Sequence, residues 1–384
     1  MSGGFLPTDA AHATLVGRLD LGDGPTPVVL RGGRVEDQSG FAPTVSELLN
    51  RLPPGVPLPA GRDLGTLDAQ ALRPAWSGGG RRLLPPLDLQ CIKAAGVTFA
   101  ASVIERVIEE QARGDPARAQ SIRDGLTTRI GADLRTVRPG GPDAERLKAA
   151  LQPQGLWSQY LEVAIGPDAE IFSKAPVLSA VGWGDWVGVR ADSRWNNPEP
   201  EVVLVCDGAG RPRGATLGND VNLRDLEGRS ALLLGQAKDN NGSCAVGPFL
   251  RLFDSRFTLD EVRNATVRLE IEGEDGFRLA ETSEMARISR DPLELARQAS
   301  GANHHYPDGF ALFLGTMFAP VQDRGADGRG FTHRPGDIVR ISCAELGVLE
   351  NRVGLCSEIP PWTFGLGALM YNLASRGLLR EARS

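Results

Sequence analysis

The sequence predicts an α+β or mainly β fold with a small β-rich module at its N-terminus. Between residues 199 and 353, short runs of β-favouring residues are separated by Gly, Asp and Pro turns. Few helical patterns interrupt these runs, and strands do not alternate regularly with helices as they do in a doubly wound α/β sheet. The chain has 384 residues, 41% of them hydrophobic and 23% charged, which is typical of a folded protein with one elaborated domain or two ordinary ones.

The N-terminal part divides into a hairpin region and a connector. Residues 13–37 alternate β-favouring runs with Gly, Asp and Pro, a pattern that predicts hairpins. Residues 52–87 hold many prolines and glycines, which favour turns. We therefore expect a boundary near residue 85, with a β-rich module over 1–85 and a larger domain over 86–384.

The larger domain is expected to begin with a helix and to end with one. Val103, Ile104, Val107 and Ile108 recur at helical spacing with charged residues between them, so residues 101–113 predict an amphipathic helix that stops at Gly114. Residues 362–380 are apolar enough for a packed terminal helix. Between them, alternating or continuous apolar runs predict strands over 201–207, 265–273, 309–316, 337–342 and 346–353.

Charge and composition narrow the possible partners. The net charge is -6 and the arginines are spread along the chain, so we expect no nucleic-acid partner. The first twenty residues lack a positive segment followed by a long apolar stretch, and no apolar run is long enough for a membrane helix. We therefore expect a cytoplasmic protein that does not bind membranes. Its five cysteines form no C-x-x-C pair and are expected to be reduced thiols.

Several common catalytic motifs are missing from the sequence. It contains no P-loop, no glycine pattern with dinucleotide-binding spacing, no H-E-x-x-H and no G-x-S-x-G. The four histidines offer no ligand spacing beyond the adjacent pair His304 and His305. The chemistry must therefore come from other residues.

A carboxylate cluster is the most informative feature. Glu199 and Glu201 lie in the segment N-N-P-E-P-E at 196–201, and Asp220 follows 19 residues after Glu201. A residue before proline is extended, and side chains two apart on an extended chain share a face, so the two glutamates point the same way. Adjacent carboxylates repel unless a cation neutralises them, and three hard oxygen donors suit Mg²⁺ or Mn²⁺. From spacing alone, a solvated acidic strand end is an equal alternative.

Lysine is rare in this chain. Only Lys93, Lys148, Lys174 and Lys238 occur among the 42 basic residues. Because Arg stands wherever either cation would serve, a retained lysine such as Lys238 is a candidate for a compact or deprotonatable amine.

From Gly96 onward the chain resembles the fumarylacetoacetate hydrolase family. The matching segments are P-E-P-E at 198–201, L-G-N-D-V-N-L-R-D at 217–225, A-K at 237–238, G-T at 315–316 and L-G-V-L-E-N-R-V at 346–353. The resemblance implies a catalytic domain over 86–384 with that family's mixed β-sheet core, in a homodimer or homotetramer. It also implies that Glu199, Glu201 and Asp220 bind one Mg²⁺, with Mn²⁺ as the alternative, and that the amine of Lys238 reaches the substrate.

One segment departs from the hydrolytic members of the family. They typically carry N-Y-x-x-H-x-x-E, whereas residues 98–105 read T-F-A-A-S-V-I-E. Glu105 is retained, but Ser102 replaces the histidine, and a hydroxyl is too weak a base to activate water near neutral pH. The departure is shared with the sugar-acid dehydratases of pentose degradation, which the chain also resembles at 17–27, 96–100, 155–172 and 193–201.

This branch implies a lyase that dehydrates a small-molecule substrate, 2-keto-3-deoxy-D-xylonate, to 2-oxoglutarate semialdehyde. Under that hypothesis Lys238 and Glu105 are the proton-transfer pair, because a dication should lower the pKa of Lys238 and burial should raise that of Glu105. Ser102, Thr316 and Arg106 are the candidate substrate-binding residues. Their alternatives are structural: a salt bridge for Lys238, a surface charge for Glu105 and a backbone-satisfied hydroxyl for Thr316.

Two other functional hypotheses use the same metal site. The first is a hydrolase or decarboxylase that acts on an acylpyruvate-like diketo acid, and Ser102 counts against the hydrolase. The second is an inactive member kept for binding, against which the retention of the three carboxylates and Lys238 argues.

Overall fold

A computed structural model of the chain describes residues 4–53, 55–113, 115, 118–119, 137–154, 157–318, 320–325 and 330–379. The side chains at 100–102, 104–105, 109 and 154 lie outside this description. Within the described ranges, no helix is long and apolar enough to cross a membrane.

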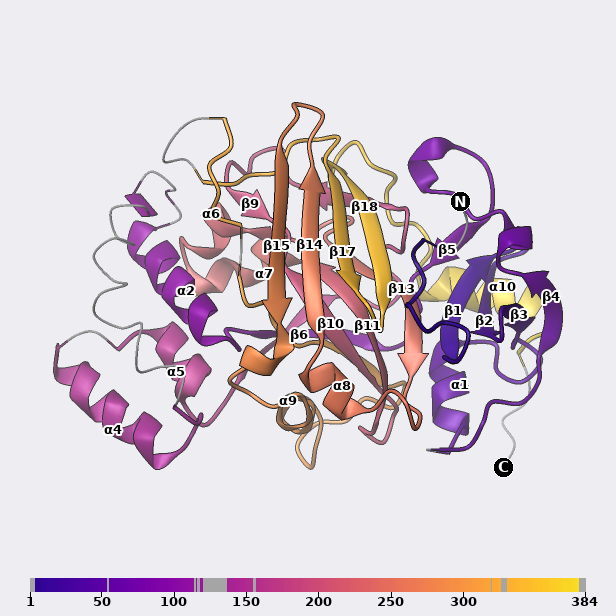
Figure 1. Ribbon diagram of the computed structural model, residues 1–384, viewed down its shortest axis with the longest axis horizontal. Helices are drawn as coiled ribbons and strands as arrows, with labels where there is room; N and C mark the ends of the chain where they lie inside the picture. The colour runs from indigo at the N-terminus through magenta and orange to yellow at the C-terminus, as the bar shows by residue number, and fades with distance from the viewer. Residues whose placement is uncertain are drawn as a thin grey trace.

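Two β-sheets form the centre of the described part of the molecule (Figure 1). The larger has eleven strands in the order β4 (Arg62–Thr66), β3 (Arg34–Asp37), β2 (Pro25–Arg31), β1 (Leu15–Asp20), β13 (Cys244–Leu252), β11 (Pro212–Asp220), β10 (Pro200–Cys206), β16 (Phe310–Phe313), β6 (Cys91–Gly96) and β7 (Glu170–Ala175), with β5 (Arg82–Leu84) paired to β1. The smaller has the order β15 (Arg278–Glu284), β14 (Thr266–Glu272), β17 (Ile338–Cys343), β18 (Gly347–Leu355) and β8 (Trp186–Val189). A short pair joins β9 (Asn196–Asn197) to β12 (Asn222–Leu223).

Helices cover the ends and one face of this arrangement. They are α1 (Val45–Arg51), α2 (Ala100–Ala112), α4 (Pro142–Leu151), α5 (Gln159–Ile165), α6 (Arg224–Glu227), α7 (Leu234–Lys238), α8 (Leu259–Arg263), α9 (Pro292–Ala299) and α10 (Leu366–Ser375). In Figure 1, α2, α4 and α5 lie at the opposite end of the molecule from β1–β4 and α10, where both termini are found.

The main core lies between the two sheets. Strands β10 and β11 contact β14, β17 and β18 across it. Along β10, Val202 and Leu204 face this core, whereas Val203 and Val205 face a second core with α1. Because β10 is buried on both faces, most of its sequence is a continuous run of apolar residues. The strand that follows Glu199 is therefore fixed rigidly from both sides.

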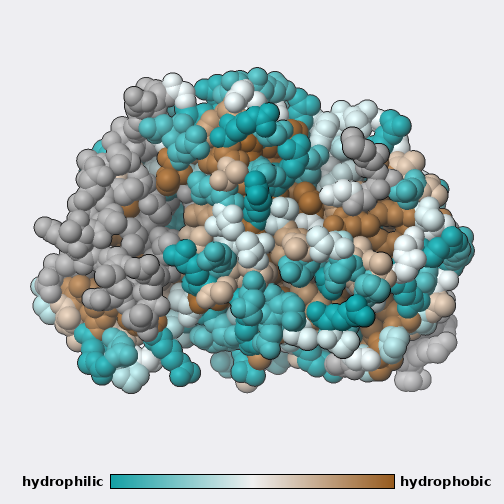
Figure 2. All heavy atoms as spheres, in the orientation of Figure 1, coloured by the Kyte–Doolittle hydropathy of each residue, from teal (hydrophilic) through white to brown (hydrophobic). Residues whose placement is uncertain are grey.

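The outer face of the smaller sheet is polar. Its strands carry ion pairs such as Arg268 with Glu270 and Arg340 with Glu350. Figure 2 shows that hydrophilic residues are prominent on this side of the molecule. An antiparallel sheet with one buried and one solvated face has this alternating pattern.

The N-terminal strands continue the larger sheet. Strand β1 pairs with β13 through Leu15 opposite Arg251 and Val16 opposite Leu250, and β1, β2 and β3 form the antiparallel hairpins that the sequence predicts. The same sheet thus runs from β4 to the strands that carry the carboxylates. The division of the chain into units 1–85 and 86–384 stays a prediction.

The predicted fold class and most of the predicted elements are confirmed. The amphipathic helix is α2, although Gly114, its predicted end, lies outside the described residues. The five predicted strands are β10, β14, β16, β17 and β18, each within a few residues of its expected bounds.

The expectation of a packed terminal helix over 362–380 is corrected. Helix α10 is shorter, and only Leu369 and Leu373 of its large apolar side chains are buried, whereas Met370 and Tyr371 are exposed. Apolar composition indicated a helix with no polar face, but it could not show that half of the surface would lack a covering element.

Candidate metal centre and active site

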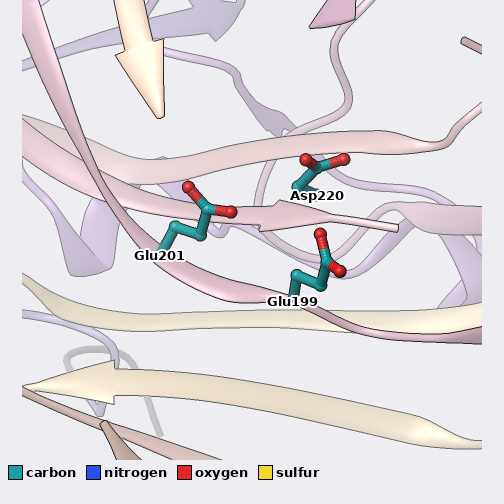
Figure 3. A group of neighbouring side chains, drawn as sticks. All are labelled: Glu199, Glu201 and Asp220. Atoms are coloured by element: carbon teal, nitrogen blue, oxygen red, sulfur yellow. The ribbon is translucent and has the colours of Figure 1, made fainter. Parts of the chain in front are cut away.

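The three predicted metal-binding carboxylates meet at adjacent ends of β10 and β11. Glu199 immediately precedes β10, Glu201 is its second residue and Asp220 is the last residue of β11. The antiparallel register places Glu201 opposite Gly218, two residues before Asp220. One oxygen from each carboxylate lies within 4.8 Å of the others, all three side chains are buried, and Figure 3 shows the carboxyl groups turned toward a common space.

Amide contacts hold Glu199 against the end of β11. Its backbone N–H donates to Asn219 Oδ1 at 3.2 Å, and its carbonyl accepts the N–H of Asp220 at 3.0 Å. The side chain of Asn222, on β12, donates Nδ2 to Glu199 Oε1 at 3.2 Å. These bonds cross-link the two segments that supply the carboxylates, so the spacing of the carboxylates is set by the backbone.

Two buried lysines neutralise part of this negative charge. Lys238, the last residue of α7, donates Nζ to Glu199 Oε2 and, at 3.0 Å, to Asp220 Oδ2. Lys174, on β7, places Nζ 2.9 Å from Asp220 Oδ1. The contact between Lys174 and Asp220 is an ion pair without hydrogen-bond geometry, so Oδ1 of Asp220 accepts no hydrogen bond from the described residues.

The pKa values of the two glutamates move in opposite directions. Burial by itself would raise the pKa of Glu199, but Lys238 and Arg106 outweigh it and hold that pKa at about 2. Burial, together with the charges of Asp220 and Glu199, raises the pKa of Glu201 well above its ordinary value. Among the described residues Glu201 forms no ion pair, and its hydrogen bond comes from the backbone N–H of Gly315 at 2.6 Å. Glu201 is therefore the carboxylate whose charge is least compensated.

The described residues fit a divalent cation. Three buried carboxylates supply the hard oxygen donors that Mg²⁺ and Mn²⁺ prefer. The raised pKa of Glu201 shows negative charge that the protein's own cations leave uncompensated. A cation held by Glu199, Glu201 and Asp220 would neutralise that charge.

Lys238 is protonated in this arrangement. Burial by itself would lower its pKa, but Asp220 and Glu199 outweigh burial and raise the pKa above its ordinary value. The lowering that the sequence predicts depends on a neighbouring dication, which would compete with the Lys238 ammonium for the same two carboxylates. The protonation state of Lys238 is thus tied to occupancy of the site.

Arg106 bridges two carboxylates. Its Nη2 donates to Glu199 Oε1 at 2.6 Å, and its Nη1 donates to Glu227, on α6. The structure therefore brings Arg106 to the centre, as expected, but with two of its nitrogens engaged by protein groups. Its contact with a substrate stays a prediction.

Thr316 lies one residue from a group that touches Glu201. Gly315 follows β16, has a φ of +94° and donates its N–H to Glu201, and a side chain at this position would collide with Thr98. The hydroxyl of Thr316 donates to the carbonyl of Phe318 at 2.9 Å, which is the backbone-satisfied state considered as the alternative. Ser102 and Glu105 are on helix α2, but their side chains lie outside the described residues.

Glu170 was missed by sequence reasoning. It is the first residue of β7, half-buried, and pairs with Gly96 of β6. Its carboxylate lies against Gly96, where even a Cβ atom would meet it. Burial, followed by the charge of Glu227, raises the pKa of Glu170 to about 7 although Arg106 and Lys238 act in the opposite direction. Such a pKa suits a group that accepts and donates protons near neutral pH.

Lys174 was also passed over. Its side chain is fully buried, and besides the ion pair with Asp220 it donates to the carbonyls of Lys238 and, at 3.3 Å, Val221. It therefore fixes the end of α7 relative to β11. The rarity of lysine was a signal for this residue as much as for Lys238.

Sequence comparisons find relatives over part of the chain. Residues 213–354 match the family model for the C-terminal part of fumarylacetoacetate hydrolase. The chain is 35% identical over 189 residues to 2-dehydro-3-deoxy-D-arabinonate dehydratase of Saccharolobus solfataricus, covering 48% of this chain and only 58% of that protein. It is 29% identical over 267 residues to a probable 2-keto-3-deoxyxylonate dehydratase of Haloferax volcanii, covering 68% of this chain and 81% of that protein.

Solved structures share the fold over most of the chain. A 2-keto-3-deoxy-D-arabinonate dehydratase complexed with magnesium and 2,5-dioxopentanoate superposes with a TM-score of 0.61 at 21% identity, over 89% of this chain and 99% of the other. A fumarylacetoacetate hydrolase of Exiguobacterium antarcticum gives a TM-score of 0.56 at 16% identity, over 89% of this chain and all of the other. At these identities the likeness supports the fold.

Replacement of Lys174 by Met should destabilise the protein strongly. The variant keeps the length of the side chain but leaves Asp220 with one cation fewer in a buried site, so we expect the free energy of unfolding to fall by about 3–5 kcal/mol. Urea unfolding measures this change. Lys93→Met is the matched control, because Lys93 is half-buried and donates to Ser173 alone in the described contacts, and it should cost less than about 1 kcal/mol. Equal losses in the two variants would contradict the role given to Lys174.

Glu170 should give the metal-free protein a specific pH dependence. Its pKa is about 7 in the folded chain against 4.5 in the unfolded one, so between these values the native state holds a proton that the unfolded state has lost. The free energy of unfolding should therefore fall as the pH rises from about 4.5 to about 7, by about 1–3 kcal/mol. Unfolding in EDTA across this range, compared with Glu170→Gln, isolates the effect. Parallel curves for the two proteins would show that the pKa of Glu170 is not raised.

Proposed function

We propose that the chain is a Mg²⁺-dependent dehydratase of a five-carbon 2-keto-3-deoxy sugar acid, within the fumarylacetoacetate hydrolase family whose model its residues 213–354 match. The observation that carries the proposal is the buried triad of Glu199, Glu201 and Asp220 with Lys238 against it. The relatives named as dehydratases support the choice of reaction within the family.

The substrate proposed is 2-keto-3-deoxy-D-xylonate. The same compound is named 2-keto-3-deoxy-D-arabinonate, because C4 is its one remaining stereocentre. The product is 2-oxoglutarate semialdehyde, also named 2,5-dioxopentanoate. A 2-keto acid presents a carboxylate and a carbonyl oxygen side by side, which could complete the coordination of a cation that takes one oxygen from each of three protein carboxylates.

The reaction needs proton transfers at three carbons. A base removes a proton from C3, and the C4 hydroxyl leaves with a proton as water. C5 then loses one of its carbon-bound protons and the proton of its hydroxyl, while C3 and C4 each gain one proton, which completes the aldehyde, so that the net change is loss of one water. Bound Mg²⁺ would polarise the keto group and make the C3 protons more acidic.

Three side chains are the candidates for these transfers. Lys238 and Glu105 are the pair proposed from the sequence, with Lys238 directly against Glu199 and Asp220. Glu170 is added because its pKa of about 7 lets it act in both directions near neutral pH. Ser102, Thr316 and Arg106 are proposed to contact the substrate, and Arg106 also holds Glu199 through its hydrogen bond.

A turnover assay tests this proposal. With added Mg²⁺ and 2-keto-3-deoxy-D-xylonate, the protein should form 2-oxoglutarate semialdehyde, detected by coupling to an aldehyde dehydrogenase. EDTA and Glu199→Gln should each abolish product, because they remove the cation or one of its donors. Glu170→Gln should lower kcat by about 10²–10⁴-fold while still binding Mg²⁺.

The control for Glu170 is Glu281→Gln. Glu281 is also a half-buried glutamate with a pKa raised by burial, but it lies on β15, outside the site. This variant should keep kcat within a few-fold of the wild-type value. Pyruvate release from an acylpyruvate, with no semialdehyde from the keto acid, would overturn the dehydratase proposal in favour of a hydrolase that uses the same carboxylates.

A further inference from the structure

Another buried acidic side chain is joined to the carboxylate cluster through an arginine. Glu227 is the last residue of α6 and is buried, and it is not one of the candidate metal ligands. Its carboxylate accepts a hydrogen bond from Nη1 of Arg106, whose Nη2 donates to Oε1 of Glu199 at 2.6 Å. One guanidinium group therefore connects Glu227 to a candidate metal ligand.

The position of Glu227 is tied to the backbone of the carboxylate site. Strand β12 pairs with β9. Strand β9 ends two residues before Glu199, and β12 begins two residues after Asp220. Helix α6 starts at the residue that follows β12, and it ends at Glu227. The pairing of β9 with β12 thus holds Glu227 at a fixed place relative to Glu199.

The two carboxylate oxygens of Glu199 have different partners. Oε1 accepts hydrogen bonds from Arg106 and, at 3.2 Å, from Nδ2 of Asn222. Oε2 accepts a hydrogen bond from Lys238 among the described residues, and the same ammonium group donates to Oδ2 of Asp220 at 3.0 Å. The ammonium group therefore lies between two of the candidate metal ligands, and Oε2 of Glu199 is the oxygen that a cation would take over from it.

The bond from Arg106 keeps Glu199 in this orientation. A guanidinium group stays charged at ordinary pH and offers its N–H groups in one fixed plane. While Nη2 is bonded to Oε1, the carboxylate of Glu199 cannot rotate without breaking that bond. Oε2 consequently stays turned toward Lys238 and Asp220.

Glu227 anchors the other nitrogen of Arg106. An arginine side chain has several rotatable bonds, and holding it in one conformation costs conformational entropy. The side chain of Arg106 is only 11% exposed, so an Nη1 that lost its acceptor would be a buried donor with little access to water. The bond to Glu227 satisfies Nη1 and fixes the plane of the guanidinium group, which sets the direction in which Nη2 meets Glu199.

We propose that Glu227 is a positioning residue of the metal centre, which acts through Arg106 to keep Oε1 of Glu199 bonded and Oε2 presented to the cation. The inference rests on the proposed use of Glu199, Glu201 and Asp220 as a Mg²⁺ site. Groups that hold metal-binding side chains in place typically change metal affinity by about 10–100-fold when they are replaced.

Mn²⁺ binding to the metal-free full chain measures this role without any turnover. The electron paramagnetic resonance signal of free Mn²⁺ gives a dissociation constant for each variant. Glu227→Ala should raise that constant by about 10–100-fold, because Arg106 loses its anchor. Glu227→Gln should stay within about threefold of the wild type, because its amide oxygen still accepts from Nη1. Glu281→Ala, on β15, is the matched control and should leave the constant unchanged.

A second background shows whether Glu227 acts through Arg106. In Arg106→Met the guanidinium group is absent, so adding Glu227→Ala should change the dissociation constant by less than about threefold. Equal losses in the two backgrounds overturn the proposal, because Glu227 would then act on the site by another route. An equal loss in Glu227→Gln and Glu227→Ala also overturns it, since the charge of Glu227 and not its hydrogen bond would then matter.

The wild type separates this inference from the proposed function. If the wild type binds Mn²⁺ and Glu227→Ala binds it equally well, the role of Glu227 is overturned and the cation site stands. A wild type that binds no Mn²⁺ overturns the cation site and this inference together.

Circular dichroism and thermal unfolding establish that each variant is folded. Glu227→Asp supplies the test if the alanine variant does not fold, because it keeps the charge but withdraws the carboxylate from Nη1. It should weaken Mn²⁺ binding more than Glu227→Gln does, and the opposite order overturns the proposal.

Discussion

Repulsion among three buried carboxylates is the constraint on which the rest of the site depends. Glu199, Glu201 and Asp220 are removed from water and held with oxygens within 4.8 Å of one another, a placement that costs free energy unless positive charge is supplied. Hydrogen bonds from the backbone of Glu199 to the side chain of Asn219 and the backbone of Asp220 prevent the carboxylates from moving apart. Positively charged groups must therefore lie next to these carboxylates.

The positively charged side chains next to the carboxylates come from distant parts of the chain. Lys174 comes from β7, Lys238 from α7 and Arg106 from α2, and each contacts Glu199 or Asp220 directly. The charges of Lys238 and Arg106 lower the pKa of Glu199, but the pKa of Glu201 stays raised. This uneven compensation is the physical argument for a dication, because one ion among the three carboxylates would balance Glu201 and release Lys238 from its present contacts.

Site residues that depend on local sequence rules could be predicted from the sequence, whereas residues that reach the site through long-range strand pairing could not. Glu199 and Glu201 depend on local rules, since prolines and strand alternation put both side chains on one face. Asp220 was grouped with them by its spacing and Lys238 was singled out by the rarity of lysine, and the family resemblance then assigned both to the site. Glu170 and Lys174 reach the centre through the pairing of β6 with β7, which no local pattern encodes. The exposed side of α10 was missed for a related reason, because apolar composition does not reveal which face lacks a neighbour.

The most direct test of the account is the anomalous diffraction of crystals loaded with Mn²⁺ as a substitute for Mg²⁺. The account predicts one strong peak in contact with an oxygen from each of Glu199, Glu201 and Asp220, and an Nζ of Lys238 that no longer bonds both Glu199 and Asp220. A peak elsewhere, or no peak with Lys238 still bridging the two carboxylates, would contradict it. In that case the cluster would be an internal ion-pair network rather than a metal centre.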